Sequence, residues 1–215
     1  TLERLDHMTG EREVRVTYPN FFKTREGDLL FRYRDGGSGN GSDYCNVYDP
    51  VTLRWRRWLD TPLHNGEGER NAYATAPAMG PDGYFHTVWV WRETPDAATN
   101  HSVSYARSRD LIHWENGAGQ PVTLPITLAK SDVVDAAPPG GGLINMCREL
   151  GFDAQGKVLV TYHRYDASGK SQAYVARAKA TGGWDIHQLS NWDFRWDFSG
   201  AGGIPGEVSL GRPKA

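Results

Sequence analysis

The chain has 215 residues, of which 39% are hydrophobic and 12% aromatic, so it can build a substantial core and is not of the disordered class. A formal net charge of −2 without a basic run argues against a nucleic-acid partner, and no apolar stretch of about 18 residues is present to span a membrane. Eight Trp, ten Tyr, 25 Gly and 12 Pro favour short strands and turns over helices.

Neither the cysteines nor the first residues identify a compartment. Cys45 and Cys147 lack the spacing of a metal site and are expected to be buried thiols, with a disulfide or a metal as the alternatives. The opening residues are charged and lack the apolar run of a signal peptide.

Strands are predicted along the whole chain, as β-branched and aromatic runs bounded by Gly, Pro, Asn and Asp. In chain order they fall into three groups of four: 16–22, 27–33, 44–48 and 55–58; then 71–76, 85–91, 103–106 and a strand at Trp114; then 142–152, 156–162, 172–177 and a strand at Trp184.

These groups share one spacing, which indicates an internal repeat. The interval from Gly27 to Val47 equals the interval from Gly156 to Ala176, and a Trp follows at the same distance in each group. In the second group the first interval, from Gly83 to Ala106, is longer by three positions. The three extra residues are predicted to lie in the hairpin that carries Asn100 and His101.

Repeated four-stranded antiparallel units are typical of a β-propeller, and a β-sandwich is the alternative. We therefore predict an all-β fold, with residues 1–215 forming a single β-propeller domain. Its blades are expected at about 13–60, 68–118 and 142–190, with partial blades at 1–12 and 192–211. Since three blades cannot close a ring of four to eight, the domain is expected to be incomplete or to pair with another copy.

Propeller topology predicts one polar face. The hairpin tips 34–43, 92–101 and 163–171 and the connections 59–70 and 116–142 should open on the same side. The plain turns 80–83 and 153–156 should lie on the opposite side.

A family resemblance covers the chain from Thr17 to about Gly203. The phrases TYPNFF, GDLLFRYRDGGSGNG, LHNGEGERNAY, NHSVSYARSRDLIHWE and NWDFRWDFSGAGG resemble the BNR repeat-containing propellers that include the ulvan lyases of polysaccharide lyase families 24 and 25. This resemblance implies a seven-bladed type of propeller and a secreted or periplasmic bacterial protein. It also implies a carbon-oxygen lyase that cleaves a uronic-acid-containing anionic polysaccharide by β-elimination.

Such a reaction needs a group that neutralises the uronate carboxylate, a base for the C5 proton and an acid for the leaving oxygen. By the resemblance, the catalytic histidine, tyrosine and arginine of the family carry over to His101, Tyr162 and Arg177. No second histidine can be placed, so the acid and base roles stay open between His101 and Tyr162. Substrate-binding roles are predicted for Asn100, Arg34, Arg70, Arg92, Arg148, His163, Tyr165 and Arg195.

Each catalytic residue also has a structural interpretation: His101 as a loop cap, Tyr162 as a core aromatic and Arg177 as a strand brace. No cofactor is expected, no metal ligands are assigned, and a structural metal ion cannot be read from the sequence.

Two other classes of function stay open. The phrase from Ser108 to Trp114 resembles a motif of five-bladed glycosidases, so a glycoside hydrolase or a sialidase-like propeller is one alternative. A hydrolase needs two facing carboxylates, and no pair stands out among Asp35, Glu67, Glu69, Glu93 and Asp166. The other alternative is a non-catalytic glycan-binding module, which needs only aromatic and hydrogen-bonding loops.

Overall fold

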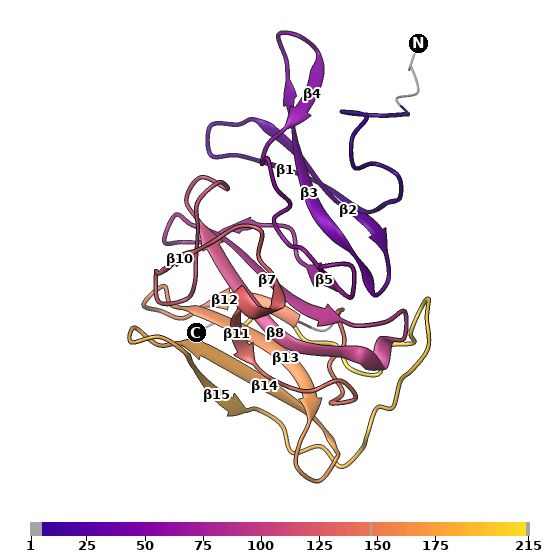
Figure 1. Ribbon diagram of the computed structural model, residues 1–215. Coiled ribbons are helices and arrows are strands. Elements are labelled where there is room, and N and C mark those ends of the chain that lie inside the picture. The colour runs from indigo at the N-terminus through magenta and orange to yellow at the C-terminus, as the bar shows by residue number, and fades with distance from the viewer. Residues whose placement is uncertain (1–5, 147, 214–215) are drawn as a thin grey trace.

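A computed structural model of the chain describes residues 6–146 and 148–213, and three antiparallel β-sheets follow one another along it. Figure 1 shows the first sheet at one end of the molecule and the second sheet between the first and the third. The expected fold class is confirmed, because the chain is all-β and repeats antiparallel sheets whose strands follow chain order.

The first and third sheets have the same order of four strands. The strands are β1 (Val16–Lys23), β2 (Leu29–Gly37), β3 (Asn40–Asp49) and β4 (Arg54–Arg57) in the first sheet, and β12 (Arg148–Phe152), β13 (Val158–Tyr165), β14 (Ser171–Ala178) and β15 (Trp184–Gln188) in the third. Short turns set the register of the third sheet. Asp153 and Asp166 each accept backbone N–H bonds from the turns that follow them, where Gly156 and Gly169 have φ values of 73° and 83°.

The middle sheet is built around the long hairpin of β7 (Phe85–Arg92) and β8 (Asn100–Ser108). Two short strands, β5 (Asn71–Ala74) and β6 (Ala78–Met79), share the inner position beside β7. On the outer side, β9 (Trp114–Glu115) and β11 (Asp132–Asp135) both pair with β8, and β10 (Pro121–Val122) pairs with β9. The middle sheet therefore has the same four strand positions as the other two, but two short strands share each of its outer positions.

The three extra residues of the second repeat have two causes. The tip between β7 and β8 spans residues 93–99, against 166–170 in the third sheet, and it includes the 3-10 helix η1 (Ala97–Thr99). The third extra residue is Ser102, a bulge with φ 50° between the pairs Val90 with Val103 and Trp91 with His101. Asn100 and His101 therefore lie in the strand and not in the loop.

Two long segments, residues 116–142 and 189–213, differ from the strand predictions. The segment 116–142, expected as a connection, contributes β10, η2 (Leu128–Lys130) and β11. Within 189–213 no strand is present; the side chains of Trp196 and Val208 pack on Ile144 beside the third sheet. The partial blades at the two ends of the chain thus stay a prediction.

The tryptophans of the repeat occupy related positions. Trp55, Trp114 and Trp184 lie in β4, β9 and β15, the strands that follow the third strand of each unit. Trp114 and Trp184 pair with the last residues of β8 and β14, whereas Trp55 pairs with the last residue but one of β3. The repeat spacing thus corresponds to a repeated strand order.

The core consists of one apolar layer on each face of the middle sheet. Trp89 and Trp91 of β7 face the first sheet, and Val88 and Val90 face the third. Because both faces are covered, all eight residues of β7 are buried. Cys45 is also buried in the first of these layers, and burial raises the pKa of its thiol to about 12. Cys147 lies outside the described residues.

Arginines from the two outer sheets hold the inner strand of the middle sheet. Arg32 of β2 donates to the carbonyl oxygens of Ala74 and Thr75 at 3.1 and 3.4 Å. From the other side, Arg148 of β12 donates to the carbonyl oxygens of Tyr73 and Val88. Because its described partners are backbone carbonyls of the middle sheet, Arg148 has a structural role between sheets, and its role in binding substrate stays a prediction.

We expect Arg148→Met to lower the free energy of unfolding by about 2–4 kcal/mol, because it removes charged donors from buried backbone carbonyls. Urea denaturation followed by tryptophan fluorescence measures this change. Arg54→Met, on the exposed strand β4, is the matched control and should change stability by less than about 0.5 kcal/mol. Equal effects of the two substitutions would contradict the proposed brace.

Candidate functional site

The site begins at Tyr73, on the inner strand β5. Its hydroxyl lies 2.6 Å from Ser38 Oγ, in the turn between β2 and β3, and accepts a hydrogen bond from Arg92 Nη1 at 3.1 Å. The neighbouring Gly39 allows this approach of two sheets, because it has φ 76° and a Cβ there would lie 2.5 Å from the Thr94 backbone. Tyr73 is thus fixed by groups from two hairpins.

Two buried arginines converge on the Tyr73 ring. The guanidinium carbons of Arg34 and Arg92 lie 5.0 and 4.4 Å from its centre. Their other hydrogen-bond partners are neutral: Thr17 for Arg34, and Ser38, Asn100 and Asn145 for Arg92.

No carboxylate in the described part of the chain neutralises either cation. Among residues 6–146 and 148–213, no carboxylate lies within ion-pair distance of Arg34 or Arg92, and Nη1 of Arg34 is buried without a hydrogen-bond partner. Burying a charge without a counter-charge is costly. The arrangement is therefore suited to a ligand that brings a negative charge.

Tyr18 lies over this cluster and is exposed. It sits in a bulge of β1 with φ 54°, although it precedes Pro19, which normally restricts a residue to extended conformations. Its ring contacts Tyr73 edge-on at 5.2 Å and Arg34 at 4.9 Å, and 56% of its surface is accessible. Backbone outliers cluster at functional sites, so this conformation makes Tyr18 a candidate site residue.

The two tyrosines have pKa values displaced in opposite directions. Burial alone would raise the pKa of Tyr73, but hydrogen bonds from Ser38 and Arg34 and the positive charges of both arginines lower it. Burial, and then the negative charge that Tyr73 carries when ionised, raise the pKa of Tyr18. Two neighbouring groups whose pKa values are driven apart can differ in protonation state at one pH, which suits them to separate acid and base roles.

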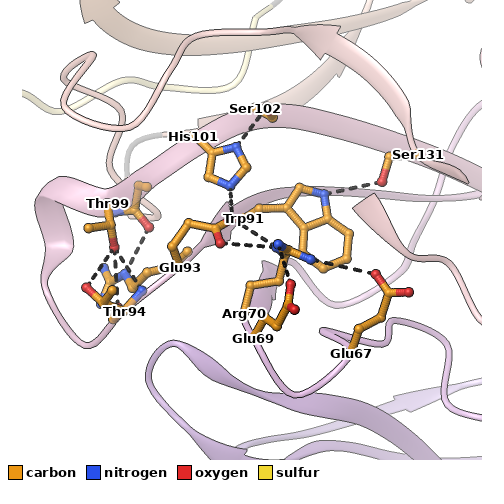
Figure 2. A network of polar contacts seen from close by, with 12 residues as sticks. Glu67, Glu69, Arg70, Trp91, Glu93, Thr94, Thr99, His101, Ser102 and Ser131 are labelled. Atoms are coloured by element: carbon orange, nitrogen blue, oxygen red, sulfur yellow. Dashed lines mark hydrogen bonds and ion pairs between the residues drawn. The ribbon is translucent and has the colours of Figure 1, made fainter. Parts of the chain in front are cut away.

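The predicted residue His101 belongs to a second cluster. Figure 2 shows Glu93 between His101 and Arg70, with Glu67 and Glu69 near the same guanidinium. Glu93 Oε1 lies 2.6 Å from His101 Nε2 and 2.9 Å from Arg70 Nε. Burial would raise the pKa of Glu93, but hydrogen bonds from Arg70 and His101 lower it. Arg70 is thus surrounded by carboxylates of this chain, which leaves less of its charge for a ligand.

The third hairpin contributes another group of predicted residues. Tyr165 and Arg195 border an open cavity of about 620 Å³, with the Arg195 guanidinium 3.7 Å from the centre of the Tyr165 ring. His163 is buried and stacks on Trp196 at 5.1 Å. Burial lowers the pKa of His163 to about 4, so its ring is neutral at physiological pH.

The remaining two predicted catalytic residues lie elsewhere. Tyr162 is fully buried, and its hydroxyl donates to Asp135 Oδ2 at 2.6 Å. Burial and the Asp135 charge raise its pKa, and unlike Tyr18 its side chain has no surface accessible to a ligand. Arg177 lies at the opposite end of the third sheet and donates to Asp153 Oδ2 at 2.6 Å. The structure does not bring Tyr162, Arg177 and His101 together.

The fold thus assembles Arg34, Arg92 and Asn100 from the predicted binding residues. It adds Tyr18 and Tyr73, which the sequence analysis did not select. The available signal was the phrase Thr17-Tyr18-Pro19 inside a predicted strand, where a proline marks an irregularity.

The described chain has neither a metal cluster nor a membrane-spanning helix. No group of three His, Cys, Asp or Glu side chains there could hold a metal ion. None of its helices has the length and apolar character needed to cross a membrane.

Comparisons with known proteins give a consistent picture. A model of the BNR repeat-containing family matches residues 1–192. Over 148 residues, 62% of this chain, the sequence is 39% identical to a long-isoform ulvan lyase of a Glaciecola species (strain KUL10). Over a match of the same length, it is 31% identical to a short-isoform ulvan lyase of an Alteromonas species (strain LOR). The match covers 14% and 28% of those proteins, respectively, so the chain spans a minor part of the curated relatives.

Solved structures support the fold. The polysaccharide lyase Uly1 superimposes with a TM-score of 0.63 at 20% identity, over 85% of this chain and 43% of that one. A PL25 ulvan lyase, solved also in complex with -[GlcA(1-4)Rha3S]-, gives 0.62 at 17% identity over 84% and 45%.

The first prediction from this geometry concerns the ionisation of Tyr73. Because two arginines and Ser38 lower its pKa, tyrosinate absorbance should begin to appear below the ordinary tyrosine pKa of 10. Spectrophotometric titration should lose this early component in Tyr73→Phe and keep it in Tyr48→Phe. A titration curve that differs equally in both variants would contradict the assignment.

The second concerns His163. Since its folded-state pKa of about 4 lies below the ordinary 6.5, the unfolded chain takes up a proton between these values that the folded chain does not. Stability should therefore fall as pH falls from 6.5 to 4. His163→Phe, which keeps the stack on Trp196, should reduce this decline, whereas His187→Phe on the exposed β15 should not. Urea denaturation at several pH values measures both slopes, and parallel slopes in wild type and His163→Phe would refute it.

Proposed function

The chain belongs to the BNR repeat-containing family, and from that premise we propose that it is part of a polysaccharide lyase that cleaves a uronate-containing anionic polysaccharide by β-elimination. The observation that carries this proposal is the pairing of Tyr18 with Tyr73 beside an arginine without a counter-charge. It supplies the three functions that the reaction needs: a cation for the carboxylate, a base and an acid.

In this mechanism the uronate carboxylate lies against Arg34. Nη1 of Arg34, which has no partner in the described chain, would donate to the carboxylate, and neutralising the carboxylate makes the C5 proton easier to remove. Arg92 holds Tyr73 and Asn100 behind it. The cost of burying the two guanidinium groups is then offset when substrate is bound.

Tyr18 is the residue that contacts the sugar, because it is the exposed member of the pair. It takes the C5 proton while its own proton moves to ionised Tyr73, and the C5 electron pair forms the C4–C5 double bond as the bond from C4 to the glycosidic oxygen breaks. Returning the proton through Tyr18 to the leaving oxygen restores both tyrosines, so no reactant is consumed other than the polymer.

The relatives guide the choice of polymer and compartment. Ulvan lyases are among the matched proteins, and one solved relative holds a GlcA and sulfated Rha repeat, so an ulvan-like polymer is the proposed substrate. Because such a polymer cannot enter a cell, we also propose a secreted or periplasmic bacterial enzyme.

The test is to incubate the full-length protein with ulvan-type uronate polysaccharides while following ultraviolet absorbance and reducing ends together. Elimination yields an absorbing C4–C5 unsaturated uronate at each new non-reducing end and one new reducing end per cleavage. We expect Tyr18→Phe and Arg34→Met to lower the rate about 100-fold or more, the usual scale of general acid–base catalysis. In Tyr73→Phe, the pH at which the cleavage rate increases should also shift upward, because the tyrosine with the lowered pKa is absent.

Matched variants separate this assignment from the sequence-based one. His101→Ala should retain much more activity than Tyr18→Phe; the reverse order would favour His101 as the proton-transfer group. New reducing ends without absorbance would instead indicate a glycoside hydrolase. Binding of the polymer with neither signal would indicate a glycan-binding module.

A further inference from the structure

A second cavity lies at the opposite end of the sheets from Tyr18 and Tyr73. Its volume is about 260 Å³, and residues from the middle and third sheets line it. The walls come from the turns before β7 and β13 and from the ends of β8 and β14. None of its lining residues belongs to the site described above.

The lining is strongly basic in a chain whose net charge is −2. It contains four cations and one carboxylate: Arg107, Arg109, Lys157, Lys179 and Asp82. Within the described chain, neither Arg109 nor Lys157 has a carboxylate at ion-pair distance, and Lys179 meets Asp185 only at 3.8 Å, between exposed groups. The cavity therefore has a local excess of positive charge.

Tyr84 holds the two arginines in place. The guanidinium carbons of Arg107 and Arg109 lie 4.3 and 4.2 Å from the centre of its ring. Arg107 is further fixed by Glu115 at 3.2 Å and by Asp82 at 3.8 Å. A preorganised guanidinium with free N–H groups is the preferred partner of planar or tetrahedral oxyanions.

The one carboxylate in the lining is already engaged. Asp82 Oδ1 lies 2.9 Å from His86 Nε2, and the other ring nitrogen of His86 lies 2.6 Å from the Tyr105 hydroxyl. Asp82 thus holds the wall of the cavity in place and does not neutralise Arg109 or Lys157.

From these features we propose that the cavity is a second anion-binding site, which takes a sulfate ester or a carboxylate of an anionic glycan between Arg109 and Lys157. Its volume suits one charged group with part of a sugar ring. Because it opens away from the Tyr18 site, it binds a separate segment of polymer. Polymer bound at one of the two sites has a raised effective concentration at the other.

The site is testable without any cleavage assay. Inorganic sulfate and glucuronate are added separately at constant ionic strength, and amide shifts of residues around Tyr84 and Lys157 are followed by NMR. We expect the double variant Arg109→Gln/Lys157→Gln to weaken binding tenfold or more. The charge-matched pair Lys23→Gln/Lys130→Gln, on exposed positions elsewhere, should bind as the wild type does.

The two probes identify the source of the anion. Binding of sulfate alone indicates a sulfate ester, of glucuronate alone a uronate, and of both a general oxyanion site. Tyr18→Phe should leave this binding unchanged, so failure of the lyase proposal does not affect it. The proposal is overturned if neither probe shifts these amides, if the double variant binds as the wild type does, or if the control pair weakens binding equally.

Discussion

The position of the inner strand β5 is the constraint on which the site depends. This strand has four residues, too few to hold itself in place, and arginines reach its carbonyl oxygens from both neighbouring sheets. The same contacts that join the sheets therefore fix the backbone of Tyr73 and direct its ring toward Arg34 and Arg92. The interactions that pack one sheet against the next are therefore also the interactions that position Tyr73.

The arginines differ in what compensates their burial. Arg32 has Asp43 and backbone carbonyls, as expected of a structural buried cation. Arg34, two residues further along the same strand, has no carboxylate partner in the described chain, and Thr17 and two tyrosines surround it. Burying a cation without a counter-charge lowers the stability of the folded protein. A bound anion would supply that counter-charge and offset this cost. This contrast within one strand separates a brace from a binding group.

Sequence reasoning could predict much of the fold, because hydrophobic runs and repeated spacing report directly on strands and their order. It also selected Arg34, Arg92 and Asn100 by placing hairpin tips on one face. It could not separate Tyr73 from Tyr162, since both are aromatic residues in apolar strands. Only the partners of the hydroxyl distinguish them: arginines and Ser38 for Tyr73, and the carboxylate of Asp135 for Tyr162. Those partners come from distant segments, so no local pattern reveals them.

The alternation of strands explains why Asn100 and His101 serve different clusters. Consecutive side chains of a strand point to opposite faces of its sheet. Asn100 pairs with Arg92 and accepts a hydrogen bond from its Nε, whereas the next residue, His101, pairs with Trp91 and contacts Glu93. Had these residues been in a loop, both could have faced one ligand. Because the hairpin continues as a strand through this pair, the pleat places Asn100 with the cluster around Tyr73 and His101 with the cluster around Arg70.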